Sequence, residues 1–195
     1  FSQTENCTSI YLIRHAEKNR VEKTNKNPHL NRKGIVRAAR WSDVLRNIKF
    51  DKVFSTNLFR TLETADPILK ANDLKVIKYS PSKQFYNNFI EQNNGITTLI
   101  VGHSNTTPSF VNSLIEEDFY DDIEDNNNGN LYYVHKCGDD LPTHVLYYIN
   151  WKMYFKKLNK VELHLHLDCS LSYEVVKKIK PEISRNQYLT DFVGT

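Results

Sequence analysis

The sequence predicts an α/β fold of three layers, in which helices cover both faces of a mostly parallel central sheet. Short runs of β-branched and apolar residues alternate with segments whose apolar residues recur at helical spacing. Ionisable residues directly follow several of these runs. Functional sites of such sheets lie at the carboxyl ends of the strands. A chain of 195 residues, of which 39% are apolar, is large enough to bury a core of this kind.

The first half of the chain supplies two expected strands, 10–13 and 52–55. Between them a helix begins with Asn31 as its N-cap. After the second strand another helix begins, and Arg60 lies on its first turn. The first helix is expected to pack on the sheet through the apolar residues Ile35, Ala38, Ala39, Trp41, Val44, Leu45 and Ile48.

The second half continues the alternation and then changes to strands alone. A strand at 75–79, a helix over about 84–93 and a strand at 97–101 precede a helix that follows Asn105. The apolar face of that helix holds Phe110, Val111, Leu114 and Ile115, and residues 121–130 form a polar, solvated loop. The runs 131–134 and 144–149 close the sheet as a hairpin. We expect residues 9–150 to form one domain, after a spacer or signal-peptide remnant (1–8) and before an appended fragment (151–195).

Three motifs at strand ends predict a phosphate pocket. Arg14 and His15 follow the first strand, Arg60 follows the second, and His103 follows the strand 97–101. An imidazole nitrogen can attack a phosphoryl group, while a guanidinium group binds phosphate oxygens with two parallel hydrogen bonds. Because parallel strands end at one edge of a sheet, we expect these side chains to converge there.

In this order the motifs resemble those of the histidine phosphatase superfamily, the phosphoglycerate-mutase-like enzymes. The resemblance rests on Arg14-His15, on Ser55 with Arg60-Thr61 and 63–65, and on 102–105, and it covers residues 9–150. It implies that His15 is the nucleophile and that Arg14, Arg60 and His103 surround the phosphoryl oxygens, with Asn105 as a further candidate. It implies hydrolysis of phosphoric monoesters or of phosphohistidine through a phosphohistidine intermediate, without a metal cofactor. Mutase-type phosphoryl transfer and phosphate binding without catalysis are the alternatives.

Two departures from the family pattern indicate which branch of the superfamily the chain resembles. The first motif reads Arg-His-Ala-Glu, and only 42 residues separate Arg60 from His103, which leaves no room for a large substrate-covering insertion. The chain therefore looks most like the short branch, which includes small phosphohistidine phosphatases. The general acid is not assigned, and Glu17 and Glu91 are its candidates. A good leaving group, such as the imidazole of phosphohistidine, needs little help from an acid.

Residues 160–168 alternate as a strand with His164 and His166 on one face, a spacing at which two histidines can bind one metal ion. This run resembles the opening strand of adenosine deaminases, so that 153–195 would be the start of such an enzyme and the two histidines would be zinc ligands. About 30 residues follow them, against ~250 in a complete barrel. Zinc would be required only if that domain were complete. Three explanations stay open: a neighbouring gene joined by read-through, a truncated natural fusion, and an edge strand that decorates the first domain.

Charge and hydropathy limit the classes of binding partner and the cellular compartment that are expected. The formal charge of +3 comes from 26 basic and 23 acidic residues spread along the chain, and no stretch has the length of an apolar membrane span. We expect a small phosphorylated substrate or a phosphoprotein, and neither nucleic acid nor a membrane span. If Phe1–Gln3 is the remnant of a signal peptide, the protein is periplasmic or secreted, and otherwise it is cytoplasmic.

The cysteines and the other histidines carry no predicted chemistry. Three cysteines are too few for a disulfide framework and lack metal-ligand spacing, although a pairing of Cys7 with Cys137 stays open. The third cysteine is Cys169. We expect the remaining histidines to be ordinary strand, turn or loop residues: His29, His135 and His144.

Overall fold

The computed structural model describes residues 6–149 together with Lys177, Glu182 and Ser184. The chain divides into two units, Phe1–Trp151 and Lys152–Thr195, and the account below concerns the first. The predicted deaminase-like strand, with its histidines at 164 and 166, lies outside the described residues. No helix in the described part has both the length and the apolar character needed to cross a membrane.

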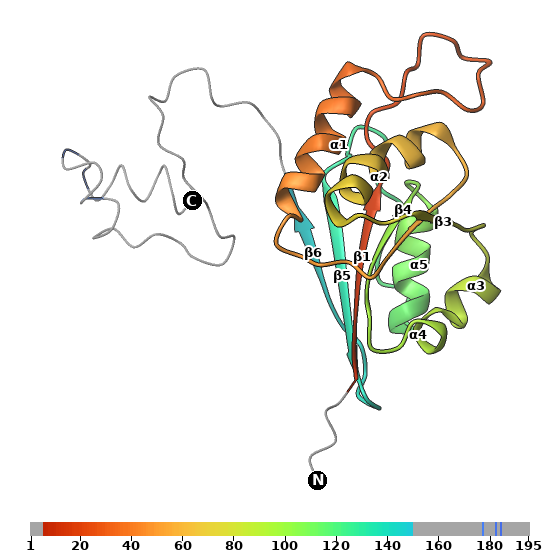
Figure 1. The fold of residues 1–195 in the computed structure, drawn as a ribbon, viewed down its shortest axis with the longest axis vertical. Helices are drawn as coiled ribbons and strands as arrows, with labels where there is room; N and C mark the ends of the chain where they lie inside the picture. Colours follow the sequence, from red (N-terminus) through yellow and green to blue (C-terminus); the bar gives the residue numbers. More distant parts are fainter. Residues whose placement is uncertain (1–5, 150–176, 178–181, 183, 185–195) are drawn as a thin grey trace. The chain divides into compact units, whose positions relative to one another are not determined.

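A six-stranded sheet forms the centre of the domain, in the order β3-β2-β4-β1-β5-β6 (Figure 1). The pairs β1/β4, β4/β2 and β2/β3 are parallel, whereas β5 runs antiparallel to both β1 and β6. The mostly parallel sheet with a closing hairpin is thus confirmed. The strands are β1 (Cys7–Arg14), β2 (Lys52–Ser55), β3 (Val76–Lys78), β4 (Thr97–Gly102), β5 (Asn130–Cys137) and β6 (Thr143–Tyr148).

Helices cover both faces of this sheet, which confirms the three-layer architecture (Figure 1). Successive side chains of β1 point to opposite faces. Leu12 packs among aromatic residues of one helical layer, and Ile13 packs with Trp41 and Ile68 in the other. The second of these layers consists of α1 (Arg32–Val44) and α2 (Phe59–Asn72), and the first consists of α3 (Lys83–Asn87), α4 (Phe89–Gln92) and α5 (Thr106–Ile115).

The N-cap prediction for α1 is confirmed, but the predicted apolar face of this helix was too wide. The Asn31 side chain accepts a hydrogen bond from the Gly34 amide at 2.9 Å. Trp41 is fully buried, whereas Ile35 and Val44 are 61% and 40% exposed. Only the strip of α1 that faces the sheet and α2 is covered, so apolar residues at the borders of that strip remain in contact with solvent.

The predicted helix over 84–93 is divided at Asn88 into α3 and α4. Strand β1 begins at Cys7, so residues expected to form a spacer belong to the sheet, where Cys7 pairs with Cys137 and Thr8 with Lys136. The open question about the cysteines is answered by a disulfide between Cys7 and Cys137. This bond fastens the start of β1 to the end of β5.

Candidate active site

The three sequence motifs meet where the parallel strands β1, β2 and β4 end. The His15 amide donates a hydrogen bond of 2.9 Å to the Gly102 carbonyl, which holds the ends of β1 and β4 together. The ring centroids of His15 and His103 are 5.7 Å apart. Arg60 lies on the first turn of α2, and its charge acts on the titration of both histidines. The structure thus places the four predicted residues around one site.

His15 is held as a neutral imidazole with one free nitrogen. Its Nδ1 lies 2.7 Å from the Ala16 carbonyl oxygen, which can only accept a hydrogen bond, so the ring proton is on Nδ1 and Nε2 keeps its lone pair. Burial lowers the pKa of His15 to about 3, and the positive charges of Arg60 and Arg14 act in the same direction. The ring is therefore unprotonated near neutral pH, as a nucleophile must be.

His103 is oriented by a threonine that the sequence motifs did not include. Its Nε2 lies 3.0 Å from the Thr56 hydroxyl, which in turn lies 2.9 Å from the Thr61 hydroxyl. When the Thr56 hydroxyl donates to Nε2, the ring proton is on Nδ1, where it can be donated to a ligand. Burial, followed by the charges of Arg60 and Arg14, lowers the pKa of His103 to about 4.

The hydrogen bonds of Arg14 differ from the expectation that both arms of its guanidinium group bind phosphate. Its Nη1 donates to the backbone carbonyls of Glu124 (2.8 Å), Asp125 (3.2 Å) and Asn127 (2.9 Å). Its Nη2 donates to the Asp125 carboxylate at 3.1 Å. One arm of the fork is thus committed to the loop before β5. The edge formed by Nε and the second Nη2 proton is what remains for a ligand.

Three buried nitrogens of the cluster have no hydrogen-bond partner among the described residues: Arg14 Nε, Arg60 Nε and His103 Nδ1. Buried donors of this kind are costly when they stay unpaired, so an unpaired group in a native structure calls for an explanation. An anion with several acceptor oxygens supplies enough acceptors for three donors of this kind. A phosphoryl group has the charge and the number of acceptors that this set requires.

Thr64 connects the loop after β1 to helix α2. Its buried hydroxyl accepts a hydrogen bond from the Ala16 amide at 2.9 Å and donates one to the Arg60 carbonyl at 2.6 Å. Ala16 also supplies the carbonyl that fixes the His15 ring. One side chain therefore holds the nucleophile loop and the arginine helix at a constant separation.

The site opens into a cavity of about 810 Å³ whose lining includes His15, Lys18 and Arg20. Asp125, at the edge of this cavity, makes ion pairs with Arg20 at 2.6 Å and with Arg14 at 3.1 Å. These hydrogen bonds hold the pKa of the Asp125 carboxyl below its usual range. The cavity, which Glu17 also lines, thus combines positive charge with ionised carboxylates.

Neither candidate for the general acid is suited to that task where the structure places it. Glu17 accepts two hydrogen bonds from Arg37, at 2.7 and 2.8 Å. Burial favours a higher pKa for Glu17, but the hydrogen bonds and charge of Arg37 outweigh it and lower the pKa, so the group is ionised. Glu91 lies on α4 and lines a surface hollow with Lys136 and Gly138, at the end of β5 that pairs with the start of β1. That is the opposite end of the sheet from His15.

Asn105 precedes α5, and its side chain makes no capping hydrogen bond to that helix. Besides Thr56, two residues that support the site were missed because their partners are distant in sequence. The loop over 121–130 was expected to be merely solvated, but buried Asn128 donates to the His15 carbonyl at 2.9 Å. Lys18, two residues beyond Ala16, adds a positive charge that acts on His103. The position of Lys18 just after the first motif was the only signal for it.

Comparisons with known proteins relate part of the chain to one family. Residues 10–81 match the profile of the histidine phosphatase superfamily (branch 1). A search of curated proteins gave no match. Neither the family match nor the solved structures support the adenosine-deaminase resemblance of 153–195.

Several solved structures share the fold. A mycobacterial glucosyl-3-phosphoglycerate phosphatase has a TM-score of 0.59 at 11% identity, over 74% of this chain and 99% of its own. For a phosphoglycerate mutase from Bacillus anthracis the TM-score is 0.54 at 14% identity, over 71% and 92%. A structure named for the phosphohistidine phosphatase SixA from Agrobacterium tumefaciens has a TM-score of 0.53 at 18% identity, over 68% and 96%. Residues 10–81 thus match the histidine phosphatase superfamily, and the domain shares the fold of these solved structures.

Proposed function

We propose that the protein is a phosphatase that hydrolyses phosphoric monoesters or phosphohistidine through a phosphohistidine on His15. The observation that carries the proposal is the pairing of a neutral imidazole with three unpaired buried nitrogens beside it, on Arg14, Arg60 and His103. A phosphate binder has no need of a free nucleophile at the centre of such a set. This favours covalent catalysis over binding alone.

In the first step, the Nε2 lone pair of His15 forms a bond to phosphorus while the bond from phosphorus to the leaving group breaks. The ring becomes positively charged and keeps its Nδ1 proton, which the Ala16 carbonyl accepts as a hydrogen bond. Arg60, His103 and the Nε–H of Arg14 stabilise the charge on the phosphoryl oxygens. In the second step water attacks phosphorus, the P–N bond breaks, and inorganic phosphate leaves with His15 restored. No step of this scheme uses a metal ion.

The carboxylates at the cavity narrow the substrate class. Glu17 and Asp125 both have lowered pKa values, so neither is suited to protonate a leaving group at neutral pH. Substrates whose leaving group departs without a proton should therefore react fastest. The imidazole of a phosphohistidine and the phenolate of an aryl phosphate meet this condition, whereas an alkyl phosphate does not.

The test is steady-state kinetics of the full chain with p-nitrophenyl phosphate, glycerol phosphate and a phosphohistidine peptide. We expect kcat/KM to be lowest for the alkyl ester. His15→Ala should lower kcat by roughly 10³-fold or more, because it removes the covalent route. Arg60→Ala should lower kcat by about 10²–10³-fold, as expected for one group that stabilises developing charge.

His144→Ala is the matched control, since this histidine lies on β6 and bonds to the Tyr120 hydroxyl at 2.8 Å rather than to the site. Its kcat should equal that of the unaltered protein. Full activity of His15→Ala, or an equal loss in His144→Ala, would contradict the proposal. Transfer of the phosphoryl group to a second substrate hydroxyl instead of to water would show mutase-type chemistry.

A further inference from the structure

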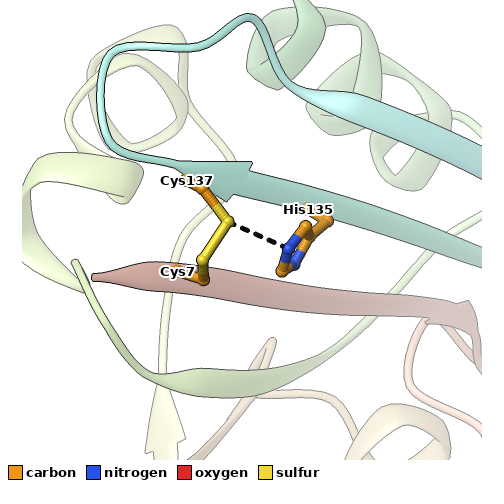
Figure 2. A group of neighbouring side chains, drawn as sticks. All are labelled: Cys7, His135 and Cys137. Carbon is orange, nitrogen blue, oxygen red and sulfur yellow. Dashed lines mark hydrogen bonds between the residues drawn. A yellow bond between two sulfur atoms is a disulfide. The ribbon is translucent and has the colours of Figure 1, made fainter. Parts of the chain in front are cut away.

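A second cluster of reactive side chains lies at the other end of strand β1. Figure 2 shows Cys7 on β1 facing Cys137 and His135 on β5. The two sulfur atoms and a ring nitrogen of His135 lie within 4.8 Å of one another. His135 and Cys137 are two residues apart on one strand, so their side chains point to the same face of the sheet.

Neighbouring hydroxyl groups turn the His135 ring toward the sulfurs. Its Nδ1 lies 3.2 Å from the Ser9 hydroxyl and 3.2 Å from the Tyr133 hydroxyl. Its Nε2 lies 3.1 Å from Cys137 Sγ. When Nδ1 donates its proton to either hydroxyl, the Nε2 lone pair faces the two sulfurs. Histidines that ligate metals are oriented in this manner, with the second ring nitrogen hydrogen-bonded to an oxygen.

We propose that, when the Cys7–Cys137 disulfide is reduced, these two thiolates and His135 Nε2 bind a zinc ion. Two cysteines and one histidine are a donor set typical of Zn²⁺, with a fourth position left for water. In this chain Cys7 and Cys137 are 130 positions apart, and the β1–β5 pairing brings Cys7 together with Cys137 and His135. Sequence spacing therefore gave no sign of the site.

The proposed replacement of the disulfide by zinc requires a thiol or phosphine as the reductant. Two electrons from the reductant break the S–S bond, and two protons convert the sulfurs to thiols. Zn²⁺ then replaces both thiol protons, which are released, while His135 contributes a lone pair without losing its Nδ1 proton. The disulfide and the metal site exclude each other, because the same sulfur electrons form either bond.

This zinc site is independent of the phosphatase site. Cys7 and Arg14 are the two ends of β1, which places the cluster roughly 23 Å from the start of the His15 loop at 3.3 Å per residue. Its predicted role is to fasten β1 to β5 under reducing conditions, as the disulfide does under oxidising ones. Removal of the zinc would therefore leave the phosphoryl chemistry in place.

The test is titration of the full chain with Co²⁺ as a spectroscopic probe, after reduction with a phosphine and removal of the excess without oxygen. We expect one equivalent of Co²⁺ to give the near-ultraviolet charge-transfer band of thiolate ligands, and Zn²⁺ to displace it. His135→Ala should weaken Co²⁺ binding by roughly tenfold or more. That variant keeps the disulfide, so its fold can be verified by circular dichroism before reduction.

Cys169→Ser is the matched control, because it removes the remaining cysteine and leaves the cluster intact. Its titration should equal that of the unaltered protein, and the oxidised protein should show no thiolate band. Cys7→Ser should abolish the band of two thiolates. A reduced protein without a thiolate band, an unchanged affinity in His135→Ala, or a band lost in Cys169→Ser would each overturn the proposal.

Discussion

Replacing Thr64 with valine removes the hydroxyl that joins the nucleophile loop to α2 while keeping the volume of the side chain. The Ala16 amide, on a residue with no exposed surface, loses its acceptor. A buried N–H left without a partner costs about 1–3 kcal/mol. The Arg60 carbonyl still accepts the backbone bond of its helix, so it adds little to the loss.

We therefore expect Thr64→Val to lower the free energy of unfolding by about 1–3 kcal/mol, measured by urea denaturation. A loss of 2 kcal/mol corresponds to a decrease in Tm of about 4–8 °C for a domain of this size. Because Ala16 also orients the His15 ring, kcat should fall by up to about 10²-fold, as a displacement near 1 Å can cause. Thr64→Ser, which keeps the hydroxyl, is the control and should retain most of the activity. Unchanged stability in Thr64→Val, or an equal loss in Thr64→Ser, would refute the reasoning.

Three further outcomes follow from the site. Thr56→Val should lower kcat more than Thr56→Ser does, since only the serine keeps a hydroxyl beside His103 Nε2, and steady-state kinetics measure the difference. Arg37→Met removes the two hydrogen bonds from Arg37 to Glu17 and leaves the ion pair of Glu17 with Lys33. Because the folded-state pKa of Glu17 lies below 4.5, the ion pair with Arg37 adds stability above that pH and loses it as the pH falls, so urea denaturation of the variant should show a smaller acid-induced loss. His15 has a pKa of about 3 in the folded state and 6.5 in the unfolded state. Between these two pH values the unfolded chain binds one more proton than the folded chain, so the free energy of unfolding decreases as the pH is lowered. His15→Gln should reduce this loss, which urea denaturation at a series of acidic pH values measures.

The core of the domain and the centre of its site could be predicted because local patterns specify them. Apolar runs that end in ionisable residues placed Arg14, His15 and His103 at strand ends, and the asparagine before α1 has the side chain that caps a helix. Parallel strands then bring their ends together by topology alone. These inferences needed no information about contacts between distant segments.

What could not be predicted depends on contacts between segments far apart in the chain. The sequence predicts Arg14 as a phosphate ligand. In the structure, however, its Nη1 donates hydrogen bonds to three backbone carbonyls of residues that lie 110 to 113 positions later. Every residue has a backbone carbonyl, so the amino-acid sequence gives no sign of which carbonyls will bind Arg14. The cluster of Cys7, His135 and Cys137 likewise depends on the register between β1 and β5, which spacing along the chain does not encode.

The measurement that tests the central claim most directly is trapping of the phosphorylated protein. The full chain is incubated briefly with an isotope-labelled aryl phosphate, denatured in alkali and digested, and the labelled peptide is identified. Alkali-stable, acid-labile label on the peptide that contains His15, and none on His15→Ala, is the predicted result. Label that persists in His15→Ala, or label on a different histidine, would contradict the account.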